Sequence, residues 1–368
     1  MDGVRAGTRQ ELDLPLDVGP VRVVPYVLGD LTYWQEDVKG NDKLRLYGQT
    51  GVRATMPMWK ADPTVQSELF NLNGLAHKVV FETEFFWADA SQDLERRDSA
   101  GNILAGLPLY DPLDDDSQEH FRRRFVDDTF RGGINDFVPL PFDERFYALR
   151  SGMQSWVTAP SAEIADDLMI GRFAIRQRWQ TKRGMPGEQR IIDWITFDVE
   201  GTFFPRAQRD NFGAKLGMWN YDFRWHVGDR LTFLSDGFFD FFNQGLRTVS
   251  IGSQLSRPEI GYLYVGFRTI EGPISSNVLS AALTYRMSEK WIATAGTSYD
   301  FSSTGNIGQS LAFTRIGESF LIRVGINSDI SRGNVGAVLG IEPRFFPNNR
   351  LGMVAGVRVP PAGARGLE

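Results

Sequence analysis

Cysteine is absent from this sequence, and histidine is scarce. Without cysteine the chain has no disulfides, no thiol nucleophile and no thiolate ligand for a metal. Its three histidines, His77, His120 and His226, lie far apart, and none belongs to a recognised nucleophile or metal-binding motif. A phosphate-binding glycine loop is also missing. We therefore expect a protein that is not an enzyme and that uses no cofactor or metal.

Long apolar runs are missing as well. No stretch reaches the roughly 18 apolar residues that mark a transmembrane helix. Strands of a membrane β-barrel escape this criterion, because every second side chain is polar. Residues Met1 to Arg5 lack the apolar core of a signal peptide, so we expect a mature chain or one whose N-terminal part is missing.

Neither sign of charge dominates the composition. The 368 residues carry a formal net charge of −6, which argues against a nucleic-acid partner. The length is ordinary for a single barrel. We expect one domain that spans residues 1–368.

The sequence does contain regular alternation, most clearly from Leu246 to Glu342. The odd positions from Leu279 to Met287 are all apolar, while the even positions between them include Ser280 and Arg286. The segment from Trp291 to Phe301 repeats the scheme. Successive side chains of a strand point to opposite faces, so these segments predict strands with one apolar and one polar face. Along the whole chain the pattern predicts about 16–18 antiparallel strands, among them strands from Val21 to Trp34 and from Leu44 to Trp59.

The charges in these strands fall almost entirely on the polar side. They are Arg268, Arg286, Asp300, Arg323, Asp329 and Glu342, and only Arg315, at a strand end, shares the apolar side. A charge that faces lipid costs roughly 2–4 kcal/mol at the bilayer midplane, which would produce this pattern. We therefore predict an all-β fold, a transmembrane antiparallel β-barrel in the outer membrane of a Gram-negative-type envelope. A soluble β-sandwich with one wet face shares the alternation and remains an alternative.

This prediction assigns side chains to lipid or lumen. Leu283, Ala295 and Ile322 should face lipid, whereas Ser298, Arg323 and Asn327 should face the lumen. The candidate lumen-facing charges are Arg172, Arg176, Arg178, Asp198, Glu200, Asp222, Arg224, Arg323 and Asp329. Unpaired charges in a narrow interior are costly, so we expect ion pairs between neighbouring strands. Two interpretations stay open: a salt-bridged wall that holds the barrel's shape, or a polar track for a charged lipid headgroup.

Residues 88–148 break the strand pattern. They hold an acidic run, Asp111–Asp116, and a basic run, Arg122–Arg124, among several aromatic residues. The stretch is too long for a hairpin turn and too aromatic for a plain disordered linker. We expect a long inserted loop, either a charged surface loop or one that folds into the lumen and constricts it.

Four segments near the N-terminus carry recognisable motifs. They are Glu11–Leu16 (ELDLPL), Gly19–Tyr26 (GPVRVVPY), Gly51–Trp59 (GVRATMPMW) and Asn73–Glu82 (NGLAHKVVFE). These segments resemble strand-and-turn patterns of the lipopolysaccharide-assembly outer-membrane protein family (LptD, also called OstA or organic solvent tolerance protein). The resemblance is specific over residues 8–90 and architectural beyond them. Because fewer strands are expected here than in the family barrel, the chain would correspond to its C-terminal β-barrel part or to a short member.

The resemblance implies a function in lipopolysaccharide transport. Family members insert lipopolysaccharide into the outer leaflet without covalent chemistry. They receive the lipid from a periplasmic bridge protein and release it through a weak seam between first and last strands, while a lipoprotein plugs the lumen. Pro15 and Pro25 are candidate seam residues, because a proline removes a hydrogen bond from the ladder. The strand that holds Pro15 should then lie beside a strand at Leu351 to Val359. The alternative function is a passive diffusion porin.

Overall fold

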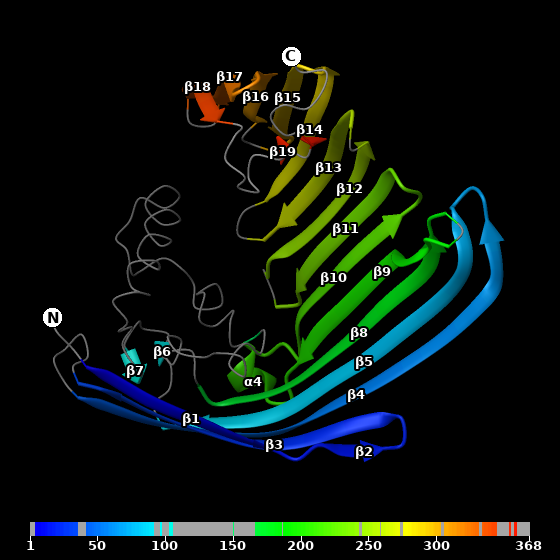
Figure 1. Ribbon diagram of the computed structural model, residues 1–368. Coiled ribbons are helices and arrows are strands. Elements are labelled where there is room, and N and C mark those ends of the chain that lie inside the picture. Colours follow the sequence, from blue (N-terminus) through cyan, green and yellow to red (C-terminus); the bar gives the residue numbers. More distant parts are fainter. Residues whose placement is uncertain are drawn as a thin grey trace.

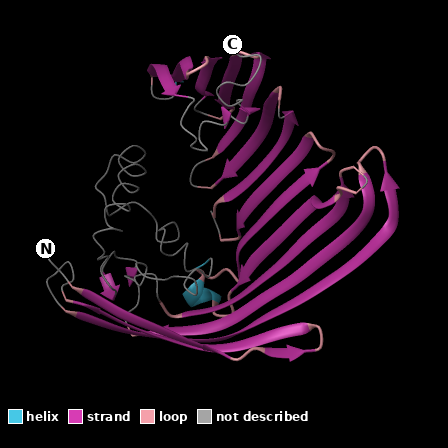
Figure 2. Ribbon diagram, viewed as in Figure 1, coloured by secondary structure: helices cyan, strands magenta, loops and turns pink. Residues whose placement is uncertain are grey.

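The computed structural model describes residues 4–35, 42–91, 96–97, 103–105, 150, 166–185, 187–242, 245–257, 259–272, 275–302, 305–330, 333–343, 353–354 and 357–358. Most of them lie in one large antiparallel sheet that curves around a concave side (Figures 1 and 2). The predicted all-β antiparallel fold is confirmed. No helix in the described ranges is long and apolar enough to cross a membrane.

Sixteen strands make up the sheet. They are β1 (Arg5–Asp13), β2 (Leu16–Val18), β3 (Val21–Trp34), β4 (Lys43–Ser67), β5 (Leu72–Ala90), β8 (Leu168–Arg183), β9 (Arg190–Phe203), β10 (Leu216–His226), β11 (Leu231–Asp240), β12 (Arg247–Arg257), β13 (Gly261–Glu271), β14 (Ser276–Ser288), β15 (Trp291–Asp300), β16 (Gly305–Ile316), β17 (Phe320–Asp329) and β18 (Asn334–Pro343). Two short pairs lie outside the sheet, β6 (Arg96–Arg97) with β7 (Ile103–Ala105) and β19 (Met353–Val354) with β20 (Val357–Arg358). A short helix, α4 (Ala207–Asp210), lies within the curve of the sheet (Figure 1).

Strand order follows the chain from β1 to β18. Both β1 and β2 pair with the same strand, β3, one after the other. The sixteen strands therefore occupy fifteen successive positions across the sheet. Every neighbouring pair is antiparallel, and β1 and β18 therefore run in the same direction. Within the described residues these two strands are the open edges of the sheet.

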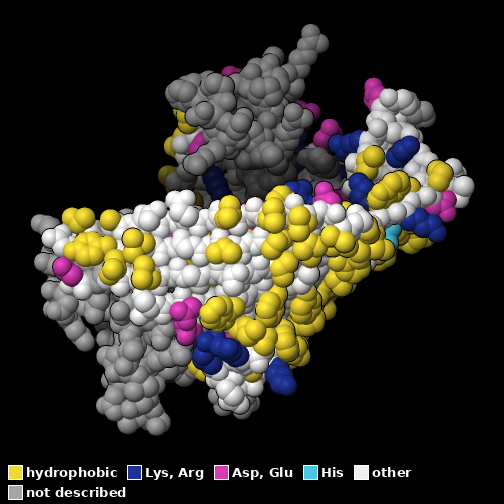
Figure 3. All heavy atoms as spheres, turned by 90° about the horizontal axis from the view of Figure 1, so that it is seen from below, with side chains coloured by type: hydrophobic (Ala, Val, Ile, Leu, Met, Phe, Trp, Pro, Cys, Tyr) yellow, Lys and Arg dark blue, Asp and Glu magenta, His cyan; other side chains and the backbone are white. Residues whose placement is uncertain are grey.

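The convex face carries a continuous belt of apolar side chains. Hydrogen-bond register places Leu263, Leu283, Ala295, Leu311 and Ile326 next to one another across β13 to β17. Leu283 is 43% exposed and Ile326 is 61% exposed, although both lie well inside their strands. The part of the convex face seen in Figure 3 likewise bears hydrophobic side chains over a broad area. An apolar surface of this extent favours contact with lipid or another apolar partner.

The predicted division of side chains between two faces is confirmed. Ile322 lies on the apolar face, opposite Arg315 of the neighbouring strand, and Arg323 lies on the other face. Arg315, predicted on the apolar side, lies there at the end of β16, with its guanidinium carbon 5.9 Å from the ring centroid of Trp291. A charge beside an aromatic ring at a strand end suits a membrane–water interface.

The concave face is polar along much of the second half of the sheet and is built there from small residues. One row of register partners runs Gly266, Ser280, Ser298, Gly308 and Asp329. Such side chains leave open space on the inner side of these strands. At the other end of the curve, near α4, inner side chains form a buried apolar cluster. It comprises Tyr26, Leu28, Tyr47, Phe86, Ala88, Ala90, Leu168, Ile170, Phe204 and Ala207.

A buried arginine joins two turns at one end of the sheet. Arg183, whose side chain is 6% exposed, donates to the carbonyls of Phe70 (3.1 Å), Asn71 (3.2 Å) and His226 (3.1 Å). It also pairs with Asp229 at 3.2 Å. The β4–β5 turn is thereby fixed to the turn between β10 and β11.

Some predicted boundaries need correction. β5 continues to Ala90, so residues 88–90 belong to a strand and the insertion starts later than predicted. Apart from Ser91, β6 and β7, the rest of the predicted insertion up to residue 148 lies outside the described residues. Of the predicted strand at 351–359, only β19 and β20 are described, and they pair with each other. The predicted position of 351–359 beside the strand of Pro15 otherwise lies outside the described ranges.

Candidate functional site on the concave face

The concave face of β8 is basic, and those of its neighbours β5 and β9 are acidic. The side chains concerned are Arg172, Arg176 and Arg178 on β8, Glu82 and Glu84 on β5, and Asp198 and Glu200 on β9. They share one face because they occupy alternate positions in register. Opposite charges on adjacent strands can pair across the ladder.

Two arginines of β8 pair with carboxylates of the neighbouring strands. Arg178 contacts Asp198 with two nitrogens, Nη1 at 2.6 Å and Nη2 at 2.8 Å, which is a bidentate geometry. Arg176 bridges the neighbouring strands, with Nε 3.1 Å from Glu82 and Nη2 2.9 Å from Glu200. These groups are about one-third exposed, so each pair contributes at most about 1 kcal/mol to stability. On this charged wall, the concave face of β5, β8 and β9, the ion pairs fix the positions of the side chains and add little to the free energy of unfolding.

The ion pairs continue towards the N-terminal strands. Arg172 Nη1 lies 3.2 Å from Glu84, which also accepts hydrogen bonds from the Tyr26 hydroxyl (2.9 Å) and from Arg53 Nε (3.0 Å). Arg53 Nη1 in turn lies 2.7 Å from Glu11 on β1. Alternating charges therefore connect the edge strand β1, through β4 and β5, to β8.

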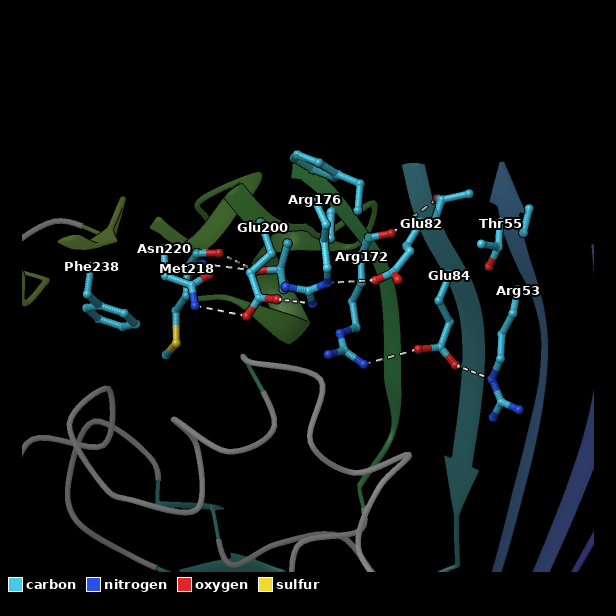
Figure 4. A pocket seen from close by; sticks show the side chains of 16 residues that line it. Arg53, Thr55, Glu82, Glu84, Arg172, Arg176, Glu200, Met218, Asn220 and Phe238 are labelled. Carbon is cyan, nitrogen blue, oxygen red and sulfur yellow. Dashed lines mark hydrogen bonds and ion pairs between the residues drawn. The ribbon is translucent and has the colours of Figure 1, made fainter. Parts of the chain in front are cut away.

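A cavity of about 360 Å³ opens on this charged wall (Figure 4). Its charged lining residues are Arg53, Arg172, Arg176, Glu82, Glu84 and Glu200, whose formal charges cancel. Asn220, Met218 and Phe238 complete one side of it (Figure 4). The volume falls in the range of small-molecule sites, about 300–1,000 Å³. Chemically the wall offers paired donors and acceptors to small hydrophilic molecules, without a strong preference for either charge.

Five of the predicted lumen-facing charges lie together on the concave face. They are Arg172, Arg176, Arg178, Asp198 and Glu200. Asp222 and Arg224 share the same face on β10, but they pair with each other, at 3.0 Å, within one strand. Arg323 and Asp329 lie on the concave face of β17, far along the sheet from this network.

Four charged residues of the network were not singled out from the sequence. Glu11, Arg53, Glu82 and Glu84 each lie on the polar face of their strands, and the alternation of polar and apolar residues is the signal that marks them. Their partners could not be named without knowing which strands are adjacent.

The two candidate seam prolines lie at the edge of the sheet. Pro15 separates β1 from β2, and Pro25 lies within β3. The amide of Leu14 donates to the Pro25 carbonyl at 3.0 Å. In an antiparallel ladder such a pair exchanges two bonds, and Pro25 lacks the amide for the second. Pro15 is the next residue along, so its nitrogen faces the open edge, where it offers no donor to an added strand.

Within the described ranges, no three histidine, aspartate or glutamate side chains lie close enough together to hold a metal ion. The chain matches no protein-family model. It matches no curated protein either.

Among solved structures, the chain is similar to variants of the Rhodopseudomonas blastica porin. One variant has 8% sequence identity and a TM-score of 0.33, over 92% of this chain and 99% of the porin chain. A triple mutant has 8% identity and a TM-score of 0.33, over 83% and 93%. A structure described as "Asymmetric conductivity of engineered proteins" has 7% identity and a TM-score of 0.32, over 81% and 90%.

Proposed function

We propose that this chain forms an outer-membrane β-barrel whose concave face lines a water-filled passage for small hydrophilic solutes. The observation that carries the proposal is the division of the strands into an apolar convex face and a polar concave face. In a bilayer the convex belt contacts lipid, and the strand ladders satisfy the backbone groups that hydrocarbon cannot. The small residues of β13 to β17 leave room for water inside the curve.

A passage of this kind requires the sheet to close. Unpaired backbone groups at the free edges of β1 and β18 would each cost several kcal/mol in hydrocarbon. Because these two strands run in the same direction, all-antiparallel closure needs an odd number of further strands between them. One more strand, added to the fifteen positions across the sheet, would give an even number, as bacterial barrels have.

The charged wall supports passage of solutes without strong charge selection. Its arginines and carboxylates neutralise one another, so neither sign is concentrated at the cavity. We therefore propose passive diffusion and no chemical step.

Conductance measurements test this function. The full chain is refolded in detergent and added to planar lipid bilayers in potassium chloride. A passive channel gives steady, uniform conductance steps that persist without any partner. If the folded chain enters the bilayer and stays silent, a passive channel is refuted.

The second candidate function is insertion of lipopolysaccharide into the outer leaflet. The proline-weakened edge at β1 and β3 and the sequence resemblance over residues 8–90 support it. In that case a lipoprotein plug and a periplasmic bridge protein would be partners, and the barrel would conduct little at rest. Depleting the protein from its native cells would then reduce lipopolysaccharide at the cell surface, whereas unchanged surface lipopolysaccharide would exclude this candidate.

A further inference from the structure

The edge strand β1 has weaker backbone support than the strands inside the sheet. On one side it is an open edge within the described residues. On the other side its line of pairing with β3 lacks one hydrogen bond at Pro25, directly beyond Asp13. An edge held in this way should fray more readily than a strand with two complete ladders.

One side chain spans this weak region from two strands away. Arg53 of β4 reaches across β3, with its guanidinium carbon 3.9 Å from the centroid of the Tyr26 ring. Beyond the ring, Nη1 lies 2.7 Å from Glu11 and 3.7 Å from Asp13, both on β1. On the inner side, Nε is held by Glu84 at 3.0 Å. Arg53 therefore connects β1 to β4 and β5 without using the ladder.

The surroundings of Arg53 fix this geometry. Tyr26 is 2% exposed, donates to Glu84 and accepts a hydrogen bond of 2.6 Å from Gln49. Its ring lies over Gly51, where an added Cβ would come within 2.8 Å of ring carbon Cε1. The missing side chain at Gly51 thus lets the ring lie flat and form a platform for the guanidinium.

We propose that Arg53 is the positioning residue that holds the proline-weakened edge strand β1 on the sheet. This role is separate from solute passage, because it concerns how one strand is held on the sheet and applies whichever molecule the barrel conducts. Lysine would keep the charge but lose the planar fork that serves Glu11 and Glu84 together. Because Arg53 and Glu11 are about one-third exposed, concentrated salt should weaken the connection.

Hydrogen exchange of backbone amides measures the effect directly. The full chain is compared with Arg53→Met in lipid nanodiscs, using peptides that cover β1 and, as an internal reference, β14 and β15. We expect exchange in β1 to become about tenfold faster and exchange in the reference strands to stay the same. Arg53→Lys should give an intermediate value. Salt at about 1 M, where the Debye length is about 3 Å, should accelerate amide exchange in β1 more in the unsubstituted chain than in Arg53→Met.

Arg176→Met is the matched control. Arg176 bridges carboxylates on the same wall but has no contact with β1 among the described residues, so exchange in β1 should not change. The proposal would be overturned if both variants accelerated amide exchange in β1 equally. It would also be overturned if Arg53→Met accelerated exchange in all strands, because Arg53 would then have only a general structural role. If Arg53→Met does not fold, Glu11→Gln combined with Asp13→Asn takes its place, since the pair of substitutions removes the charge of both outer partners and leaves Arg53 paired with Glu84. Unchanged exchange in β1 of that variant would also overturn the proposal.

Discussion

Moving one charge across β17 distinguishes a lipid-facing strand from a water-facing one. Val324 lies in the middle of β17 on the convex face and is 55% exposed, while its neighbour Arg323 lies on the concave face. If the convex face contacts lipid, Val324→Arg should lower the free energy of unfolding by about 2–4 kcal/mol. If that face were wet, as in a soluble sandwich, a substitution at so exposed a position would change stability by about 0.5 kcal/mol or less.

The assay is reversible urea unfolding from phosphatidylcholine vesicles, followed by tryptophan fluorescence. Asn327→Arg on the same strand but on the concave face is the control, and it should cost less than about 1 kcal/mol. A chain with Arg323→Val and Val324→Arg together keeps the composition unchanged and should still lose most of the 2–4 kcal/mol expected for the single variant. Equal costs for Val324→Arg and Asn327→Arg would refute the assignment of the two faces.

Three further predictions concern the turns, the edge and the charged wall. Arg183→Ala should lower the free energy of unfolding by about 3 kcal/mol in the same vesicle assay, because three backbone carbonyls and a carboxylate lose a buried donor. Pro25→Ala should slow amide exchange in β1 by about threefold to tenfold, since the restored amide can donate to Leu14; faster exchange would contradict the ladder geometry. Arg176→Gln should shift the reversal potential in a potassium chloride gradient towards cation passage, and Glu200→Gln should shift it towards anions; a shift of the same sign in both would exclude this wall from the passage.

Much of the fold could be predicted from alternation, because a strand's two faces are a property of adjacent residues. β3 begins and ends where the sequence indicated, at Val21 and Trp34. β4 was predicted to end at Trp59 but continues to Ser67. The sequence Asp62-Pro63 is typical of a turn, yet here a bulge between Asp62 and Gln66 absorbs it and pairing with β5 resumes.

The charged wall was only partly predictable for a related reason. β8 and β9 form a hairpin, so the pairing of Arg178 with Asp198 follows from local register. β5 and β8 are separated by a long stretch of chain, and nothing in the sequence indicated that Glu84 would lie beside Arg172. The contact of Arg53 with Glu11 crosses an intervening strand and depends on the flat Tyr26 ring. Contacts of this kind can be identified only when the three-dimensional positions of the strands are known.

A cysteine scan along β17 tests the central claim most directly, and the absence of native cysteine makes it clean. Single cysteines replace each residue from Phe320 to Asp329 in the chain reconstituted in bilayers. A water-soluble maleimide should label positions 323, 327 and 329, whereas probes at 322, 324 and 326 should be protected from it and quenched by brominated lipid tails. Equal labelling at both sets of positions would contradict a strand with one face in lipid and the other in water.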